Sequence, residues 1–331
     1  MCIALISTEH PDYSLIIINN RDEYLRRPTA PASFWPSPNT HILGGRDLAR
    51  ATQGTWMGIT KSGKVAVLTN YRERTTDAAT GQQSRGAIVN NWLTRTPDQP
   101  ISTYVEEMVN SPTARNVGGF SLVCGYVGEP LAIVSNRSSA LDQISWIAEK
   151  QGQTKGLSNT VFDDRSWPKI LDGEKLVSEA IGAAVEKGEG EEELIQRFLE
   201  VLNTNTLPAL GEDATAEDYL PDFRKSIFIP LIGTREKGKA EQSRVPATAG
   251  ENAPERSKCA EGHGVKKEAE AGNDILDQSY LHGPYGTQKQ TVILVRQDGT
   301  VKYFERTLYD QNAEAVPFGQ GDRSFEFEVT R

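Results

Sequence analysis

The chain has 331 residues, of which 37% are apolar, and its formal net charge at neutral pH is −9. This length allows one large domain or two ordinary ones, and the apolar content is enough for a substantial core. Lys and Arg occur only in scattered pairs, which argues against nucleic-acid binding, because neutralising phosphates needs clustered basic residues. No stretch approaches the roughly 20 apolar residues of a membrane span, and no secretory leader is recognisable.

The cysteines and histidines indicate no metal site. Cys2, Cys124 and Cys259 lie too far apart in the sequence to indicate a disulfide framework or a zinc ligand set. The histidines show no metal-type spacing either. We therefore expect a chain that resides in a reducing compartment, with no metal and no cofactor.

Strand-like runs come first in chain order, and many of their residues are β-branched. Two hairpins are predicted, one around Gly63 in "TWMGITKSGKVAVLTN" and one around Asp298 and Gly299 in "TVILVRQDGTVKYFERTL". The predicted strands in the first half of the chain are 2–7, 13–18, 55–60, 64–70, 120–126 and 131–135.

Helical periodicity follows in the middle of the chain, at 84–95, 101–111, 167–187 and 191–203. Strands at both ends of the chain with helices between them predict an α+β fold in which the terminal segments share a sheet. Residues 224–232 predict one further strand before the final hairpin.

Residues 234–273 contain no Ile, Leu, Met, Phe, Tyr or Trp. Such a segment does not bury enough apolar surface to offset its ordering entropy, so we interpret it as a disordered insertion. The remainder of 1–331 is then predicted to form a single domain.

The stretch "IIINNRDEYL" is an apolar run that delivers Asn20, Arg21, Asp22 and Glu23 at its end. One interpretation is a turn, because Asn and Asp readily leave a strand by bonding their own backbone. The other is a ligand pocket. If residues 2–7 and 13–18 pair as antiparallel neighbours, the end of the second strand lies beside Cys2.

Cys2 has two interpretations as well. It is a small apolar residue that begins a strand, or it becomes the first residue once the initiator methionine is removed. In the second case an α-amine titrating near 7.7 to 8.0 can accept the thiol proton, so that no histidine is needed for nucleophilic catalysis. An arginine nearby can then stabilise the thiolate or grip a carboxylate, and an acidic neighbour can orient the terminal ammonium.

Several stretches of the sequence together resemble a known family. "MCIA", "NNRDEYLRRPTAP", "GGRDLARATQGTWMGITKSGKVAVLTNYRE", "SRG", "GLSNT" and "PYGTQKQTVILV" are similar to the transport and Golgi organization protein 2 family, also named for its NRDE motif. That family in turn resembles the cysteine group of N-terminal-nucleophile hydrolases. The resemblance implies a four-layer αββα sandwich with the nucleophile at the start of an inner strand.

The resemblance also implies roles for individual residues. Cys2 stands in the place of the nucleophile, and Arg21 in that of an arginine at the end of the second strand. Asn70 matches an asparagine of the oxyanion hole, where a fixed donor is worth a few kcal/mol of barrier. Asn159 matches a second asparagine with a structural or catalytic role.

Two positions depart from the pattern of the hydrolases and the family. Tyr24 stands where the hydrolases have an aspartate, and the acidic residues nearby are Asp22 and Glu23. On an extended segment the side chains of Arg21 and Glu23 lie on one side, and the side chain of Asp22 lies on the other. Gln288 stands where the family usually has an arginine.

Arg46, Asp47 and Trp56 have two interpretations. They form the rim of a ligand pocket, with Trp56 as a flat apolar wall, or Arg46 and Asp47 pair locally while Trp56 packs in the core. With Asn20, Glu23 and Gln288 they complete the candidate ligand-binding residues.

Two functions remain open. The first is a hydrolase-like fold retained as a binding module for an amphipathic anion, for which the resemblance implies Golgi organization and secretion and a lipid, acyl-coenzyme A or haem as ligand. The alternative is an active N-terminal-cysteine amidohydrolase or thioesterase on an apolar acyl substrate. We expect a cytoplasmic chain, and the resemblance implies association with the Golgi or the mitochondrion.

Overall fold

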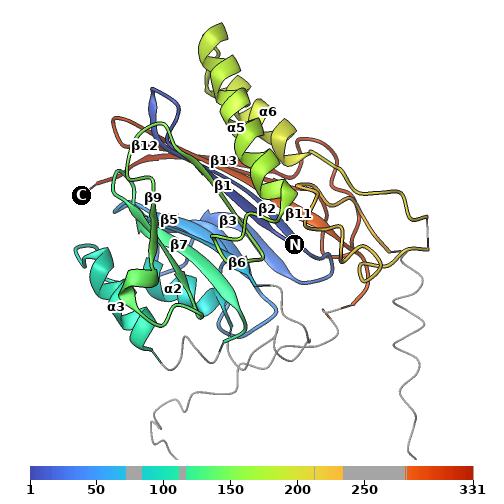
Figure 1. Ribbon diagram of the computed structural model, residues 1–331, viewed down its shortest axis with the longest axis horizontal. Coiled ribbons are helices and arrows are strands. Elements are labelled where there is room, and N and C mark those ends of the chain that lie inside the picture. The colour runs from blue at the N-terminus through green and yellow to red at the C-terminus, as the bar shows by residue number, and fades with distance from the viewer. Residues whose placement is uncertain (72–83, 112–116, 212, 234–279, 281, 331) are drawn as a thin grey trace, which may run out of the picture.

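The computed structural model describes residues 1–71, 84–111, 117–211, 213–233, 280 and 282–330. The described strands form two antiparallel sheets that lie face to face, and helices cover the outer side of each sheet (Figure 1). The predicted insertion at 234–273 lies outside the described residues.

The first sheet joins strands from both ends of the chain, as the sequence predicted. Its spatial order is β10-β1-β2-β11-β12-β13. The strands are β1 (Ile3–Ser7), β2 (Tyr13–Tyr24), β10 (Thr154–Ser158), β11 (Tyr285–Arg296), β12 (Thr300–Thr307) and β13 (Asp322–Glu328).

The second sheet follows the chain order from β3 to β9. Its strands are β3 (Thr29–Phe34), β4 (Ile42–Asp47), β5 (Met57–Thr60), β6 (Lys64–Asn70), β7 (Phe120–Tyr126), β8 (Leu131–Ser135) and β9 (Ser145–Ile147).

The helices occupy the two outer layers. Those over the first sheet are α5 (Pro168–Lys187) and α6 (Glu191–Leu202), and those over the second sheet are α2 (Gly86–Leu93) and α3 (Ile101–Asn110), with a short 3₁₀ turn at η1 (Leu141–Gln143). Helix α5 begins at Pro168, whose missing N–H costs nothing in the first turn, and ends at Gly188, which takes a left-handed φ of 62°.

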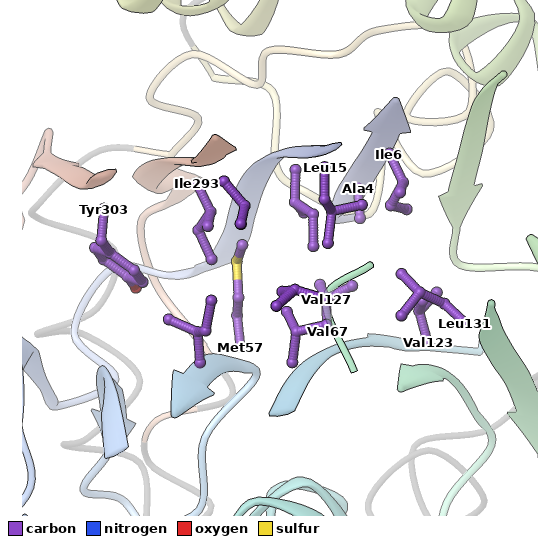
Figure 2. Close-up of a cluster of buried hydrophobic side chains, with 14 of the residues drawn as sticks. Ala4, Ile6, Leu15, Met57, Val67, Val123, Val127, Leu131, Ile293 and Tyr303 are labelled. Carbon is purple, nitrogen blue, oxygen red and sulfur yellow. The ribbon is translucent and has the colours of Figure 1, made fainter. Parts of the chain in front are cut away.

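Three buried apolar clusters hold the layers together. The inter-sheet cluster contains residues such as Ala4, Leu15 and Ile293 of the first sheet, which face Met57 and Val67 of the second (Figure 2). Separate clusters join each sheet to its helices. The α+β prediction is therefore confirmed, with four layers in the order αββα.

Each hairpin prediction is confirmed at its turn. Gly63 and Gly299 have φ values of 81° and 89°, which side chains with a Cβ rarely adopt. Sequence patterns missed β3, β4, β9, β10 and β13, several of which are short or interrupted by Pro or Gly.

Two strand predictions were wrong. Residues 224–232, all described, form a loop that joins β11 through a bridge between Ile232 and Tyr285 and a backbone hydrogen bond from Thr287 to the Ile229 carbonyl oxygen. The strand predicted to end at Ile18 continues to Tyr24, because the backbone of its polar end pairs with β11. The turn interpretation of Asn20–Glu23 is therefore wrong.

Candidate functional site

The polar end of β2 lies beside the chain start. Ile3 of β1 pairs with Asn20 of β2, so the hairpin brings the following residues next to Cys2, as the antiparallel arrangement predicted. Because side chains alternate along a strand, Arg21 and Glu23 face the second sheet, whereas Asp22 faces the helix layer. This alternation gives the site two separate sides.

On the helix side, Met1 is held at every polar atom of its backbone. Its α-ammonium lies 3.2 Å from the Oδ2 atom of Asp22 and also donates to the hydroxyl of Tyr285. The ammonium group of Lys169, in the first turn of α5, donates to the Met1 carbonyl oxygen. Thr287 donates its hydroxyl to the other Asp22 oxygen over 2.7 Å.

Burial shifts the proton affinities of this group of residues. Burial lowers the pKa of the Met1 amine, against the effect of Asp22, which raises it. Burial likewise lowers the pKa of Lys169 and raises that of Tyr285 far above its ordinary value. Asp22 is the carboxylate that compensates the two buried cations.

The Cys2 thiol is partly exposed and lies between the two sides of the site. Its Sγ atom is 3.6 Å from the backbone oxygen of Asp22. Burial raises the pKa of the thiol, and the lowering effect of the terminal ammonium does not offset this. With Met1 in place the thiol is therefore protonated at neutral pH, and the amine nearby belongs to Met1.

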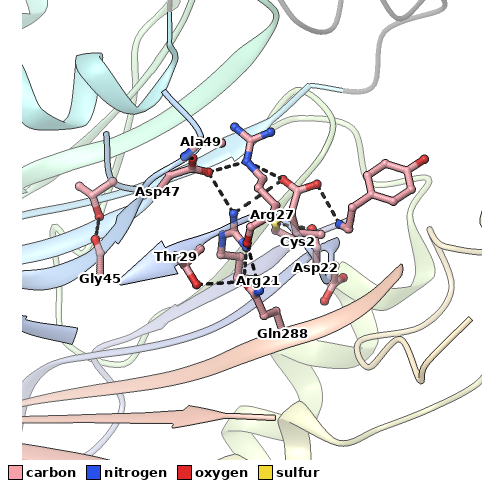
Figure 3. Close-up of polar contacts among 12 residues, drawn as sticks. Cys2, Arg21, Asp22, Arg27, Thr29, Gly45, Asp47, Ala49 and Gln288 are labelled. Carbon is pink, nitrogen blue, oxygen red and sulfur yellow. Dashed lines mark hydrogen bonds and ion pairs between the residues drawn. The ribbon is translucent and has the colours of Figure 1, made fainter. Parts of the chain in front are cut away.

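On the inter-sheet side, Arg21 is buried in a network of its own (Figure 3). Its guanidinium donates to Gln288 and to Asp47, the latter over 3.1 Å, and lies 3.8 Å from Glu23. The guanidinium also stacks over Trp56, 4.7 Å from the ring centroid. Arg21 thus already has partners on several sides.

Asp47 pairs with two arginines. Arg27 donates to it over 2.6 Å in addition to Arg21. Burial would raise the pKa of Asp47, but the two arginines hold it below its ordinary value. Among the described residues Arg46 bonds Gln53 instead, over 2.7 Å. Of the interpretation in which Arg46 and Asp47 pair and Trp56 packs in the core, the pairing is therefore wrong, whereas Trp56 is buried in the inter-sheet cluster.

The asparagines take different positions. Asn20 points into the helix layer, where its amide donates to the carbonyl oxygens of Leu202 and Ile227, so it does not line the Cys2 side. The Asn159 amide donates over 2.6 Å to the backbone oxygen of Asn70. In the described part of the chain no hydrogen bond to the Asn70 side-chain amide is found.

Sequence reasoning missed Lys169 and Arg85. Lys169 lies four residues before Gly173 on the buried stripe of α5, so a lysine in an apolar helical pattern was the available signal. Arg85, which precedes α2, lies close enough to Cys2 and Glu23 for their charges to raise its pKa. Burial is the larger effect and lowers that pKa to about 10.

A hollow in the structure lies away from this site, and the described residues hold no candidate metal site or membrane span. A hollow of about 250 Å³ includes Thr8, Tyr13 and Gln297 in its lining, at the opposite end of β1 and β2 from Cys2. The described residues contain no group of three or more His, Cys, Asp or Glu placed to hold a metal ion. No helix among them is both long and apolar enough to cross a membrane.

The fold and the site define an αββα sandwich with a cysteine at the head of an inner strand and an acidic residue against the chain terminus. The sequence profile of the family described as Transport and Golgi organisation 2 matches residues 1–310. The chain belongs to this family.

Curated relatives extend over most of the chain. The Transport and Golgi organization protein 2 homolog of Homo sapiens is 29% identical over 307 residues, which cover 91% of this chain and 88% of the relative. An uncharacterized protein of Saccharomyces cerevisiae is 24% identical over 99% of this chain and 100% of its own. Among solved structures, a mutant conjugated bile acid hydrolase from Clostridium perfringens aligns with a TM-score of 0.46 and 9% identity, covering 100% of this chain and 98% of that chain.

Proposed function

We propose that this protein binds an anionic amphipathic ligand at Cys2 and acts through that ligand in transport and Golgi organization, as the name of its family suggests. Lipids, acyl-coenzyme A thioesters and haem are the ligand classes that combine an anionic group with an apolar body. Arg85 anchors the anionic group.

The observation that carries this proposal is the poor pairing of Arg85. Arg85 is half-buried, and its guanidinium donates a hydrogen bond in the described structure to the carbonyl oxygen of Gly119, over 3.3 Å. Within the described ranges no carboxylate lies at ion-pair distance from it. A half-buried cation without a counter-ion is partly desolvated at a cost, and a ligand carboxylate or phosphate would supply the counter-ion.

Arg21, the arginine that the sequence predicted for this role, fits it less well than Arg85 does. Arg21 is already bonded to Asp47 and Gln288 and stacked on Trp56, so an incoming anion would have to displace a partner. Arg27 is likewise bonded to Asp47. We therefore assign the binding of the anionic group of the ligand to Arg85 instead of Arg21.

The test is titration of purified protein with acyl-coenzyme A thioesters and with haemin. Arg85→Met should weaken binding of the ligand by roughly 10- to 150-fold, which corresponds to about 1.5–3 kcal/mol for a charge-assisted bond. Arg197→Met on α6 is the matched control, because that arginine pairs with Glu189 away from Cys2. Equal affinities of wild type and Arg85→Met for every probe would overturn the proposal.

A second function, hydrolysis of an amide or thioester by Cys2, is favoured by Asn70. Its side-chain amide has no hydrogen bond to the described residues, which leaves it available as an oxyanion donor. The reaction would need the chain that begins at Cys2, whose α-amine can serve as the base. In that chain Cys2→Ala should abolish turnover and keep ligand binding if the protein is a hydrolase; a carrier would show no turnover in either form.

A further inference from the structure

We propose that the space filled by Met1 is the subsite for a short apolar acyl group, which becomes available when the chain begins at Cys2. This inference rests on the proposed function, because it assigns the apolar end of the same ligand. Met1 is 8% exposed and belongs to a cluster of buried apolar residues. The other members of this cluster are Trp167, Ile170, Ala216, Tyr219, Phe223, Ile229, Ile232 and Tyr285.

The walls of this space are built independently of Met1. Phe223 stacks on Tyr285 with 5.2 Å between ring centroids, and Tyr219 stacks on Phe223 at 6.4 Å. Ile232 and Tyr285 exchange backbone hydrogen bonds of 2.8 and 2.9 Å, which tie the 224–232 loop to β11. Loss of Met1 therefore leaves a largely preformed apolar site, which is the usual state of small-molecule pockets.

The polar atoms around Met1 match an acyl carbonyl. Lys169 donates to the Met1 carbonyl oxygen, and that carbonyl is bonded covalently to the nitrogen of Cys2. A ligand carbonyl in the same place would accept from Lys169 and lie next to the thiol. Asp22 keeps a cation nearby after the loss of Met1, because its charge also acts on Lys169, whose pKa it raises.

The size of the space limits the ligand. A methionine residue fills it, so it accepts a short acyl chain; a long acyl chain or a haem ring exceeds it. The anionic end of the ligand then extends past Cys2 toward Arg85, whose pKa the charges of Cys2 and Glu23 raise. The ligand class is therefore a short-chain acyl group carried on an anionic group.

Whether the chain begins at Met1 or at Cys2 is decided before the chain folds. In the folded chain the α-ammonium of Met1 is buried against Asp22 and Tyr285, where an aminopeptidase cannot reach it. Removal of methionine is favoured by the small side chain of the second residue, so it must occur on the nascent chain. A chain that begins at Met1 and one that begins at Cys2 would thus differ in one residue and in access to this subsite.

The experiment compares full-length chains released from a cleavable fusion so that one begins at Met1 and the other at Cys2, with intact masses verified. Both are titrated with acetyl-, butyryl-, hexanoyl- and palmitoyl-coenzyme A. We expect butyryl and hexanoyl thioesters to bind the Cys2 form at least tenfold more tightly than the Met1 form, with little difference for the palmitoyl thioester.

Two controls separate the parts of the proposal. Lys169→Met in the Cys2 form should weaken binding of butyryl-coenzyme A several-fold and leave unchanged the binding of S-butyl-coenzyme A, a thioether without the carbonyl. Circular dichroism verifies that each variant is folded.

The same affinity and chain-length dependence in the Met1 and Cys2 forms would overturn the subsite, while binding that still depends on Arg85 would leave the proposed function intact. Failure of all the thioesters to bind either form would overturn the subsite as well, and haemin titration then tests the proposed function by itself.

Discussion

Asp22 and the α-ammonium of Met1 form a buried ion pair, with 3.2 Å between the carboxylate Oδ2 atom and the nitrogen. This ion pair links the first of the two acidic residues in the NRDE motif, Asp22, to the chain terminus. Removing two charges from water is costly, and their attraction offsets this only when the remaining lone pairs are bonded as well. Thr287 bonds the second Asp22 oxygen and so helps to complete the arrangement.

We therefore expect Asp22→Asn in the Met1 form to lower the free energy of unfolding by about 3–5 kcal/mol, because it leaves a buried ammonium without its counter-ion. Chemical denaturation measures the change. Glu179→Gln on α5 is the control, because Glu179 forms an exposed pair with Lys175 and should contribute less than about 1 kcal/mol. A loss at Asp22 no larger than that at Glu179 would contradict the buried pairing.

The second prediction concerns the pH dependence of Cys2. Burial raises its pKa above the ordinary value of 9.0, so the folded chain binds this proton more tightly than the unfolded chain does. The stability contributed by the neutral thiol is then complete below pH 9 and is lost as the pH rises beyond it. Alkylation of the Met1 form by iodoacetamide should accordingly be slow at pH 8.

Mass spectrometry of peptides alkylated at a series of pH values checks this prediction, in a Cys259→Ser background that leaves two thiols. The rate at Cys2 should still be rising as the pH passes 9, in parallel with the thiolate fraction. Cys124 is fully buried and should stay unreacted in the folded chain. A rate at Cys2 that levels off near neutral pH would mean a lowered thiol pKa.

The third prediction concerns Arg21. Because its guanidinium bonds Asp47 and Gln288 inside the sandwich, Arg21→Ala should lower the free energy of unfolding by about 2–4 kcal/mol, leaving buried acceptors without a donor. Arg46→Ala is the control and should cost less than about 1 kcal/mol, since its bond to Gln53 is exposed. Urea denaturation with near-native stability for Arg21→Ala would show that the network contributes little.

Sequence alone could predict the neighbours of Cys2 on its own sheet. An antiparallel pairing of consecutive strands follows from local pattern, and it places Asn20 opposite Ile3 without knowledge of any distant segment. The alternation of side chains then separates Arg21 and Glu23 from Asp22. Both steps were predictable because they depend on residues close in the sequence.

The remaining parts of the site depend on segments that are distant in the sequence. Lys169 reaches Met1 because α5 packs across β1, and Tyr285 reaches it because β11 pairs with β2. No local pattern in a single sequence specifies such contacts. Likewise, the charge of Cys2 acts on Arg85 because the second sheet, which carries α2 on its outer side, packs against the first sheet.

The last prediction separates a structural asparagine from a ligand-binding one. Asn20 was expected to line the pocket, but its amide donates to Leu202 over 2.8 Å and to Ile227 over 2.9 Å, joining the end of α6 and the 224–232 loop to β2. Asn20→Ala should therefore cost about 2–4 kcal/mol of unfolding free energy, because two buried carbonyl oxygens lose their donor. Asn110→Ala, which removes an exposed amide bond to the Glu106 carbonyl, should cost less than about 1 kcal/mol. Thermal denaturation compares the two variants, and thioester titration of folded Asn20→Ala should give the wild-type affinity; a loss of affinity without a loss of stability would return Asn20 to the binding site.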